Sequence, residues 1–472
     1  MSRLVVVSNR VGDPRKPAAG GLAVAVGESL ASGAGGLWFG WSGQISEEAA
    51  PGEGELHMQH AGRSTLATVD LSRPDHDSYY LGYSNQALWP AFHYRLDLAD
   101  FERSQFEGYK RVNRMFAAKL SALLRPDDVI WVHDYHLIPL AAELRMLGCT
   151  QRIGFFLHIP LPPPTILAAI PGHEGLMRWF FAYDLVGLQT QLDLEHFVRF
   201  IRDEARARPM GGDRYQAYER TVCARSLPIG IDVEEFQHLA RSREAIETYT
   251  TLKDEYAKRR LLVGVDRLDY SKGLPHRFRA FRELLANYPE NRMSATLIQI
   301  ASPTRESVHA YEDIRHQLEG LSGEINGNYG ELDWMPVRYI HRTWSRRRLA
   351  GLYRNAKVAL VTPLRDGMNL VAKEFIAVQD AEDPGVLVLS RFAGAAEQLR
   401  EALLVNPYDI ETTAQLIQRA LRMPLEERRE RHAALYERVR RDDVHAWRRA
   451  FLAALSSEQA TDAEQEVAEG HA

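Results

Sequence analysis

The 472-residue sequence has little cysteine, no long apolar run and no excess of basic charge. Its two cysteines, Cys149 and Cys223, lie in apolar segments without metal-ligand spacing, so we expect buried thiols in a reducing compartment. No segment is apolar enough to span a bilayer, and no apolar signal region follows the basic start. A net charge of −5 offers no positive field for nucleic acid or an anionic membrane. These absences predict a cytoplasmic protein.

Several familiar catalytic motifs are also missing. The sequence contains no Walker A motif, no G-x-G-x-x-G fingerprint and no G-x-S-x-G elbow. P-loop nucleotide hydrolysis, dinucleotide binding and acyl hydrolysis therefore lack support. Asp75 and Asp77 form a D-x-D pattern, but Pro74 precedes them, which favours acidic residues at a helix start over a metal site.

What the sequence does contain is a regular alternation of apolar β-rich runs with helical stretches. Continuous apolar strands separated by helices are typical of parallel sheets covered on both faces, so the fold class is α/β. Residues 53–70 read as a hairpin-like insertion. The first series of expected strands covers 4–8, 37–41, 129–133, 153–158, 185–188 and 222–228. The second series covers 261–265, 295–300, 337–341, 358–362, 386–390 and 403–405.

The two series predict two doubly wound, Rossmann-like domains that face each other across a cleft. The chain is too long for one hydrophobic core. We expect an N-terminal domain over 1–233 and a C-terminal domain over 234–441. A helix at about 442–457 is expected to pack back on the first domain. The acidic segment 458–472 is expected to be a disordered tail.

The stretch 358–375 is the centre of the functional prediction. It runs from a β-branched strand through a glycine-containing charged loop into a helix. The N–H groups at 369–371, at the helix start, suit a phosphate. Asp366 and Glu374 are acceptors suited to sugar hydroxyls. An ordinary strand–loop–helix with solvated charges is the alternative.

A second charged turn leaves the strand that begins at residue 261. Arg267 and Lys272 could clamp a pyrophosphate between a bidentate guanidinium and a compact ammonium. The alternative is a turn whose cations pair with Asp266 and Asp269. Residues 326–330 are expected to form a loop beside the same face.

Polar residues at other strand ends extend the candidate site. Arg10 follows the first strand, and Gly20 and Gly21 allow a backbone to approach a ligand closely, although a plain turn explains them equally well. Arg305 offers a further cation after another strand.

Two neighbouring strands of the first series also end in polar side chains. Asp134 and His158 would point into one crevice if the strands are adjacent. His133 and His136 could suggest zinc, but rings at a strand end diverge and no third ligand is near. The aromatic stretch at 79–94 suits either a sugar face or a local hydrophobic cluster.

Long motifs in the sequence resemble the trehalose-6-phosphate synthase family, retaining glycosyltransferases of family 20 with the two-domain GT-B fold. The resemblance runs from residue 1 to about 455. The matching motifs are RLVVVSNR at 3–10, GGL at 20–22, GLWFGWSG at 36–43, LWPAFHYR at 88–95, WVHDYHL at 131–137, RIGFFLHIP at 152–160, RLDYSKGLP at 267–275, TPLRDGMNLVAKE at 362–374 and LSRFAGAA at 389–396.

The resemblance implies an acceptor site for glucose 6-phosphate. Arg10, Tyr80 and Arg305 match the family's clamp on the phosphate. Trp89 and Asp134 match residues beside the acceptor sugar.

The resemblance also implies a donor site for a nucleoside-diphosphate glucose, most often UDP-glucose. The matching residues are Gly20 and Gly21 over the phosphates, Arg267 and Lys272 on the diphosphate, Asp366 and His158 on the glucose, Asn369, Leu370 and Val371 under the nucleotide, and Glu374 on the ribose. Trp344 stands near the donor base where the family commonly has Phe. Catalysis would then involve Asp134, His158, Arg267, Lys272 and Asp366.

The family transfers glucose with retention and needs neither a metal ion nor another cofactor. Without an obvious carboxylate nucleophile, a front-face displacement is the favoured mechanism. The resemblance implies a homo-oligomer, dimer or tetramer, and a separate trehalose-phosphate phosphatase downstream. Two alternatives stay open: a glucosylglycerol-phosphate synthase, and a non-catalytic subunit that senses sugar phosphate.

Overall fold

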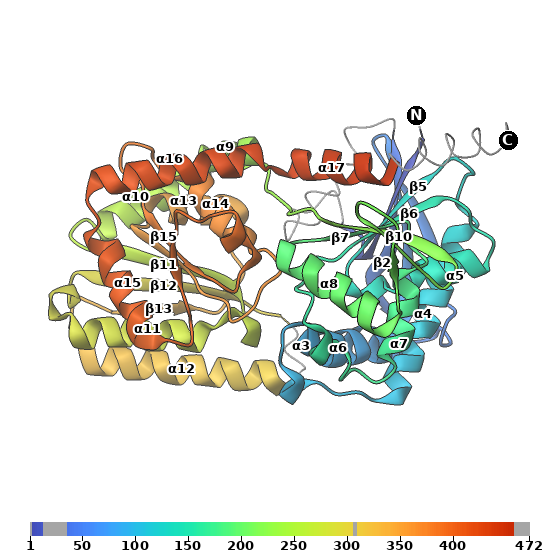
Figure 1. The fold of residues 1–472 in the computed structure, drawn as a ribbon. Coiled ribbons are helices and arrows are strands. Elements are labelled where there is room, and N and C mark those ends of the chain that lie inside the picture. Colours follow the sequence, from blue (N-terminus) through green and yellow to red (C-terminus); the bar gives the residue numbers. More distant parts are fainter. Residues whose placement is uncertain (1, 13–34, 305–308, 457–472) are drawn as a thin grey trace. The chain divides into compact units, whose positions relative to one another are not determined.

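The structure is a computed structural model that describes residues 2–12, 35–304 and 309–456. The chain folds into two compact units, one formed by 1–228 with 446–472 and the other by 229–445. The first unit surrounds a mostly parallel sheet, and the second surrounds a parallel sheet (Figure 1). The α/β fold class is therefore confirmed. Gly20, Gly21, Arg305 and the predicted tail at 458–472 lie outside the described residues.

In the part of the chain described, the first unit has a ten-stranded sheet with the order β3-β4-β2-β1-β5-β6-β7-β10-β9-β8. Its seven central strands, from β4 to β10, are parallel, and its outer strands β3, β9 and β8 run antiparallel to their neighbours. The strands are β1 (Leu4–Arg10), β2 (Gly36–Ser46), β3 (Leu56–Ala61), β4 (Ser64–Ser72), β5 (Val129–His133), β6 (Arg152–Phe156), β7 (Leu185–Leu188), β8 (Arg208–Pro209), β9 (Arg214–Ala217) and β10 (Arg220–Ser226).

Helices of the first unit connect these strands and cover the sheet. The longest described one, α4, packs against the aromatic segment that precedes it, which forms a π-helix labelled η1. The helices are α2 (Arg73–Asp75), η1 (His76–Leu88), α3 (Trp89–Phe92), η2 (Leu96–Leu98), α4 (Arg103–Ser121), η3 (Tyr135–Leu137), α5 (Leu140–Met146), α6 (Pro164–Leu167), α7 (His173–Phe180), α8 (Gln191–Glu204) and α17 (Val444–Ser456).

The alternation of side chains along β6 explains how both sheet faces are covered. Phe155 packs against Phe180 of α7, whereas Phe156 contacts Phe451 of α17 on the other face. Gly154 lies beneath the same helix, because a Cβ there would come within 2.7 Å of the Phe451 ring. Neighbouring residues of one strand therefore anchor helices on opposite faces.

The second unit has a parallel sheet whose six strands, among the described residues, have the order β13-β12-β11-β14-β15-β16. Figure 1 shows α9, α10, α13, α14 and α16 on one face and α11, α12 and α15 on the other. The strands are β11 (Arg260–Arg267), β12 (Ala295–Ser302), β13 (Val337–Ile340), β14 (Val358–Val361), β15 (Val386–Ser390) and β16 (Leu403–Val405). The helices are α9 (Val233–Ala240), α10 (Arg243–Glu255), η4 (Tyr270–Lys272), α11 (Leu274–Asn287), η5 (Pro289–Asn291), α12 (His309–Tyr329), α13 (Arg346–Asn355), α14 (Leu370–Val378), η6 (Gly394–Glu397), α15 (Ile410–Arg422) and α16 (Leu425–Arg441).

Each strand predicted from the sequence overlaps a strand of the structure, and the expected hairpin is the antiparallel pair β3–β4. The loop expected at 326–330 is wrong, because α12 continues to Tyr329. Asn326 is held in that helix by two hydrogen bonds with the backbone of Val337. Tertiary pairing at the sheet edge thus outweighs the weak helix propensity of the NGNYG sequence.

The helical segment after β10 divides into α9 and α10, because Ser242 starts a new helix by accepting a hydrogen bond from the Ala245 N–H. One smaller expectation needs correction. Cys149 and Cys223 are both free, but only Cys223 is buried. Cys149 lies after α5, in a surface turn where burial is incomplete.

Candidate functional site

In the first unit, Arg10 at the end of β1 lies exposed beside a tight turn of β2. Its guanidinium carbon is 5.7 Å from the centre of the Trp41 ring. Gly43, at φ +89°, lies directly behind the guanidinium, since a Cβ at this position would approach its atoms to 2.5 Å. Gly43 therefore allows both the backbone conformation and the position of Arg10.

Tyr80 joins the same cluster from the π-helix η1. Its ring is 5.3 Å from Trp41 and stacks on His136, with 6.0 Å between ring centres and a 14° interplanar angle. Arg10 and Tyr80 therefore share contacts with Trp41. Sequence reasoning missed the π-helix, whose extra residue per turn no hydrophobic periodicity reveals.

The structure shows the aromatic segment to be a largely buried hydrophobic cluster. Tyr79 is fully buried, and its hydroxyl donates to Asn9 Oδ1 over 2.8 Å. Trp89 is also buried, with its ring 5.8 Å from Tyr135, the residue after Asp134. Tyr80 keeps part of its surface exposed. The segment is thus mainly a hydrophobic cluster that supports a few partly exposed rings.

Asp134 follows β5 in a strained conformation, with φ +77° and ψ 164°. Its N–H donates to Phe156 O over 2.8 Å, and its carboxylate Oδ1 accepts from the His158 N–H over 3.2 Å. The structure therefore brings Asp134 and His158 together. A non-glycine residue in this region costs of order 1–3 kcal/mol and often marks a functional position.

His158 also contacts a second histidine, His133, the last residue of β5. The distance between His133 Nδ1 and His158 Nε2 is 3.0 Å. Burial lowers the pKa of His158 to about 3 and that of His133 well below its usual value. Both imidazoles are therefore neutral at pH 7. His136 instead packs among tyrosines, so the predicted divergence of His133 and His136 is confirmed.

In the second unit, Lys272 and Asp366 form a close ion pair. Lys272 Nζ donates to Asp366 Oδ2 over 2.6 Å, and the two side chains are 10% and 14% exposed. Asn369 donates to the same carboxylate oxygen over 3.0 Å. Three predicted site residues, which come from two strand-end loops, are thus connected to one another.

The acids that could have neutralised this cation have other partners. Asp266 pairs with the fully buried Arg277, while Asp269 accepts hydrogen bonds from the Ser271 N–H and the Tyr311 hydroxyl. The alternative to a diphosphate clamp required Lys272 to pair with Asp266 or Asp269. The structure shows Lys272 paired with Asp366 instead. Arg267 ends β11 with its side chain exposed.

The helix α14 begins beside the Lys272–Asp366 pair. Asn369 is its N-cap residue and has left-handed backbone angles, φ +76° and ψ 87°. The first N–H groups of a helix lack intrahelical acceptors and carry partial positive charge. The backbone at Leu370 and Val371 therefore provides an electropositive surface next to Asp366. Gly273 lets the neighbouring loop approach, since a Cβ there would be 2.4 Å from Thr362 O.

Glu374 and Lys373 follow on α14 and differ in role. Burial raises the pKa of Glu374 to about 7, against the opposing effect of Arg346. Lys373 donates to Ile229 O and Gln398 Oε1, each over 2.7 Å, and burial lowers its pKa to about 7. Lys373, which the sequence left without a role, thus fastens the first residue of the second unit to its interior.

Trp344 lies in the loop before α13 and is 9% exposed. The Arg348 guanidinium carbon is 3.7 Å from its ring centre, within cation–π range. Arg346, two residues after Trp344, binds both carboxylate oxygens of Glu235 at 2.9 Å. The charge of Arg346 also acts on Glu374. Arg346 thus acts on Glu374 from the start of α13, the helix that follows the Trp344 loop.

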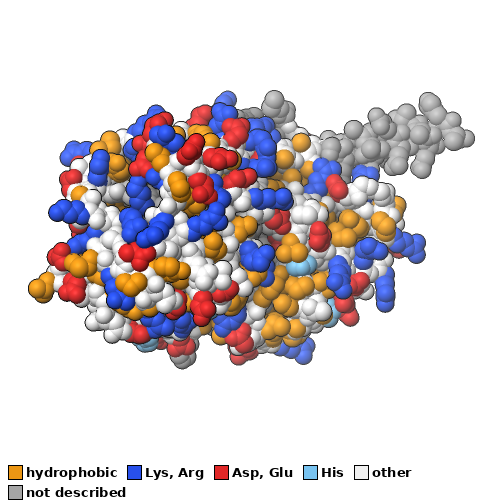
Figure 2. Space-filling view, turned by 60° about the vertical axis from the view of Figure 1, so that its left-hand side comes forward, with side chains coloured by type: hydrophobic (Ala, Val, Ile, Leu, Met, Phe, Trp, Pro, Cys, Tyr) orange, Lys and Arg blue, Asp and Glu red, His pale blue; other side chains and the backbone are white. Residues whose placement is uncertain are grey.

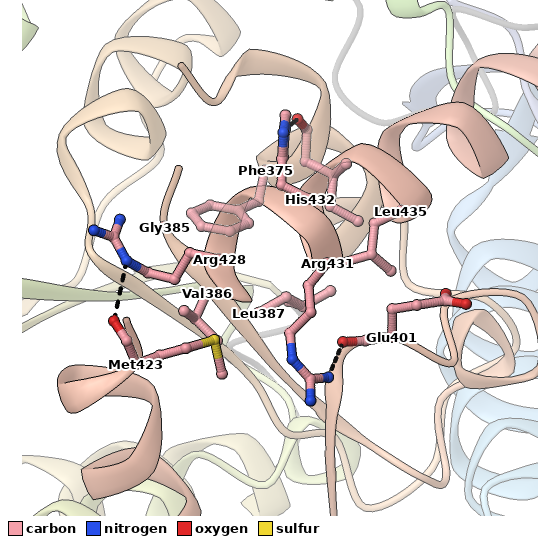
Figure 3. A pocket seen from close by; sticks show the side chains of 11 residues that line it. Phe375, Gly385, Val386, Leu387, Glu401, Met423, Arg428, Arg431, His432 and Leu435 are labelled. Atoms are coloured by element: carbon pink, nitrogen blue, oxygen red, sulfur yellow. Dashed lines mark hydrogen bonds between the residues drawn. The ribbon is translucent and has the colours of Figure 1, made fainter. Parts of the chain in front are cut away.

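A cavity elsewhere in the second unit is too small to compete with these surfaces. Its volume of about 10 Å³ has room for one water at most. Figure 3 shows Phe375, Met423 and Leu435 around it, with Arg428 and Arg431 bonded to the backbone oxygens of Met423 and Glu401 at its rim. Such a cavity is a packing defect between α14 and α16.

Acidic and basic side chains are intermingled on the face shown in Figure 2. Within 2–12, 35–304 and 309–456, no cluster of three or more His, Cys, Asp or Glu is arranged to hold a metal ion. Asp75 is instead a buried helix-start acid paired with Arg111. Across the same ranges, no helix has the length and apolar character to cross a membrane.

Comparison with known proteins decides the family. Residues 10–457 match the family described as glycosyltransferase family 20. The chain belongs to this family. A relative from Sinorhizobium fredii, named trehalose-6-phosphate synthase, is 50% identical over 460 residues, which cover 97% of this chain and 99% of the relative. The resemblance recognised in the sequence is therefore confirmed.

Solved members of family 20 share the fold. An α,α-trehalose-phosphate synthase (UDP-forming) from Burkholderia xenovorans, crystallised in complex with glucose-6-phosphate, matches with 50% identity and a TM-score of 0.92. That match covers 96% of this chain and 100% of the other. An E. coli structure described as bound with UDP-2-fluoro glucose matches with 46% identity and a TM-score of 0.92, covering 96% and 99% of the two chains.

Proposed function

We propose that this chain transfers glucose from UDP-glucose to glucose 6-phosphate, which forms α,α-trehalose 6-phosphate and UDP. The observation that carries the proposal is the end-to-end match, at 50% identity, to a UDP-forming synthase solved with glucose-6-phosphate. The strand-end surfaces of the two units supply suitable chemistry for both substrates. The reaction would take place in the cytoplasm.

The acceptor, glucose 6-phosphate, would bind to the first unit. The exposed Arg10 guanidinium, held between Trp41 and Gly43, would bind the phosphate together with the Tyr80 hydroxyl. Trp89 would border the sugar ring, and the Asp134 carboxylate would accept a hydrogen bond from an acceptor hydroxyl. Arg305, which belongs to the second unit, is proposed to complete the phosphate clamp.

The nucleotide part of the donor, UDP-glucose, would bind mainly to the second unit. Arg267 and Lys272 would neutralise the diphosphate, with Gly20 and Gly21 closing over it and the backbone of Asn369, Leu370 and Val371 beneath it. Asp366 and His158 would contact the transferred glucose. Glu374 would accept a hydrogen bond from the ribose, and Trp344 would lie near the base.

The arrangement around Asp366 favours a front-face displacement. Its Oδ2 already binds Lys272 and Asn369, so it is a poor nucleophile for the anomeric carbon. In the proposed step, the bond from that carbon to the UDP oxygen breaks while the acceptor hydroxyl oxygen bonds from the same face. The departing phosphate oxygen takes the acceptor proton. No intermediate covalent bond to the protein is needed.

Charge stabilisation during this step would come from cations of the chain. Negative charge grows on the diphosphate as it leaves, and Lys272 and the start of α14 lie next to each other. We therefore expect unchanged activity in EDTA. Activity that depends on added Mg²⁺ or Mn²⁺ would contradict this part of the proposal.

A grid of substrates tests the proposal as a whole. UDP-, GDP- and ADP-glucose are each combined with glucose 6-phosphate or glycerol 3-phosphate, and diphosphate release is measured together with the sugar product. We expect the fastest release from UDP-glucose with glucose 6-phosphate. Release only with glycerol 3-phosphate would indicate a glucosylglycerol-phosphate synthase. Binding of sugar phosphate without any turnover would indicate a non-catalytic sensor.

Other expectations stay predictions. The domain limits at 1–233 and 234–441, the return helix at about 442–457, and the homo-oligomer belong to this group. A separate phosphatase would remove the phosphate from the product.

A further inference from the structure

His133 is a buried residue in the first unit without a role in the reaction as described so far. It ends β5, has 0% of its surface exposed and packs 4.7 Å from the Trp131 ring and 6.3 Å from the Trp447 ring. Its Nδ1 is 3.0 Å from Nε2 of His158. His158, the proposed glucose contact, is only partly buried. The fully buried His133 ring thus contacts the His158 ring, which is partly exposed.

The hydrogen bond between the two rings holds a single proton. Burial keeps both rings neutral at pH 7, as the lowered pKa values show. A neutral imidazole has one N–H donor and one acceptor nitrogen. In the His133–His158 hydrogen bond, one of the two facing nitrogens must therefore carry the proton and the other must accept it.

The surroundings of His133 decide which nitrogen is protonated. Its other nitrogen, Nε2, is buried, and no group among the described residues forms a hydrogen bond with it. A proton there would create a buried unpaired N–H, which is rarer in proteins than an under-satisfied acceptor. The favoured arrangement places the proton on Nδ1, which donates to His158 Nε2. His158 must then carry its own proton on Nδ1.

Asp134, the residue after His133, holds the backbone of His158 by a hydrogen bond. Asp134, which follows His133, accepts from the His158 N–H and donates its own N–H to Phe156 O. Consecutive residues of the β5 end thus hold both the ring and the backbone of His158. Asp134 has a positive φ, and its carboxylate faces the backbone of this loop.

We propose that His133 is a positioning residue that holds His158 in the tautomer with the proton on Nδ1, so that His158 offers a hydrogen-bond donor to the transferred glucose. This inference rests on the proposed function for its ligand, a hydroxyl oxygen of the donor sugar. A His158 Nδ1–H that is fixed in advance can donate to a hydroxyl oxygen of the glucose. The ring then does not have to change its tautomer during glucose transfer.

Nitrogen NMR of the full-length wild-type protein with ¹⁵N-labelled histidine tests the tautomer directly. The His158 signals are assigned by their loss in the variant His158→Gln. We expect His158 to show a protonated Nδ1 and an unprotonated Nε2 between pH 6 and 8. A protonated Nε2 on His158, or two protonated nitrogens, would overturn the proposal. The wild-type spectrum decides this without any His133 variant.

Two substitutions of His133 separate positioning from packing. In His133→Asn the amide N–H can occupy the place of the Nδ1 donor, whereas His133→Leu fills space without a donor. We expect the Leu variant to lose about tenfold in kcat, the value of one hydrogen bond, and the Asn variant to stay within about threefold of wild type. KM for glucose 6-phosphate should stay nearly constant in both. Equal kcat losses in two folded variants would contradict the positioning role.

Failure of this inference differs from failure of the proposed function. If the substrate grid shows another donor or acceptor while the NMR spectrum shows Nδ1–H on His158, only the ligand is wrong. If the grid gives trehalose 6-phosphate but His158 carries Nε2–H, only the role of His133 is wrong.

Discussion

The strand ends of the two units carry different chemistry on similar parallel sheets. In the first unit, the proposed site contains two neutral imidazoles, His133 and His158, among aromatic rings. In the second, the Lys272–Asp366 ion pair lies at the start of α14. Parallel sheets place ligands at the carboxyl ends of their strands in both cases. The side chains at these ends, and not the architecture, decide what each unit can bind.

The difference fits the proposed substrates. A sugar presents hydroxyl groups and C–H faces, which neutral donors and aromatic rings can bind without desolvating a full charge. A diphosphate must be met by cations and by the N–H groups of a helix start. Arg10 is the exception in the first unit, and it is the residue to which we assign the acceptor phosphate.

The largest expected effect concerns the charged region. Lys272→Ala should lower kcat by about 10²–10³, because the ammonium stabilises charge that develops as the diphosphate leaves. Steady-state kinetics with both substrates varied would measure it. The matched control is Lys357→Ala, which removes a lysine whose Asp383 partner and own side chain are about half exposed. An unchanged kcat in Lys272→Ala would contradict the assignment of the diphosphate to the charged region of the second unit.

The next effect concerns Arg10, the cation beside the Trp41 ring. Gly43→Ala should displace the Arg10 guanidinium and raise KM for glucose 6-phosphate by about 10–100-fold, the value of a hydrogen bond to a charged group. The measurement is initial rate against glucose 6-phosphate at saturating donor.

The control for that substitution is Gly148→Ala. Gly148 has a similar positive φ, +82° against +89°, but nothing lies within 4 Å of a Cβ there. Both variants carry the same backbone strain, and only one crowds Arg10. An equal rise in KM in both, or a matching rise in KM for the donor, would show that Arg10 does not bind the acceptor phosphate.

The third prediction compares buried titratable groups. The His133–His158 pair is neutral at pH 7. Lys373 has a pKa of about 7 in the folded protein, compared with the ordinary lysine value of 10.5 that applies to the unfolded chain. Between these pH values the unfolded chain holds the proton and the folded protein releases it. Stability from this residue therefore rises as pH increases from 7 towards 10.5.

Lys373→Met removes this dependence and keeps a long side chain. Urea unfolding at pH 7 and pH 9 should show wild type gaining on the order of 2 kcal/mol relative to the variant. Lys357→Met, at an exposed site, should show no such difference. A pH-independent gap between wild type and Lys373→Met would mean that Lys373 keeps an ordinary pKa.

The smallest effect is expected at the nucleotide base. Trp344→Phe introduces the ring that the family commonly has, and a Phe ring can still stack with Arg348. KM for UDP-glucose should change by about threefold or less. A preference for another nucleoside diphosphate glucose in this variant would show that Trp344 sets the choice of base.

Local sequence patterns predicted the strands of both sheets well, because short continuous apolar runs such as 358–361 are typical of strands buried in a parallel sheet. They failed where distant contacts decide the structure. Asn326 stays helical because its side chain pairs with the backbone of Val337. The π-helix at His76–Leu88 has no periodic signal.

The candidate site shows the same limit. Long motifs pointed to Lys272, Asp366, Asp134 and His158, and the structure joins them in two pairs. Motifs could not show that Gly43 stands behind Arg10, because that contact depends on the packing of β1 beside β2. Sequence reasoning considered His133 but did not predict its hydrogen bond with His158, because that bond depends on the pairing of β5 with β6.

The central claim is that one unit binds the acceptor and the other binds the nucleotide. Calorimetric binding of UDP and of glucose 6-phosphate to Arg10→Ala and Arg267→Ala tests it most directly. We predict that Arg10→Ala loses glucose 6-phosphate binding and keeps UDP binding, while Arg267→Ala does the reverse. Loss of both ligands, or the opposite pattern, in folded variants would contradict the account.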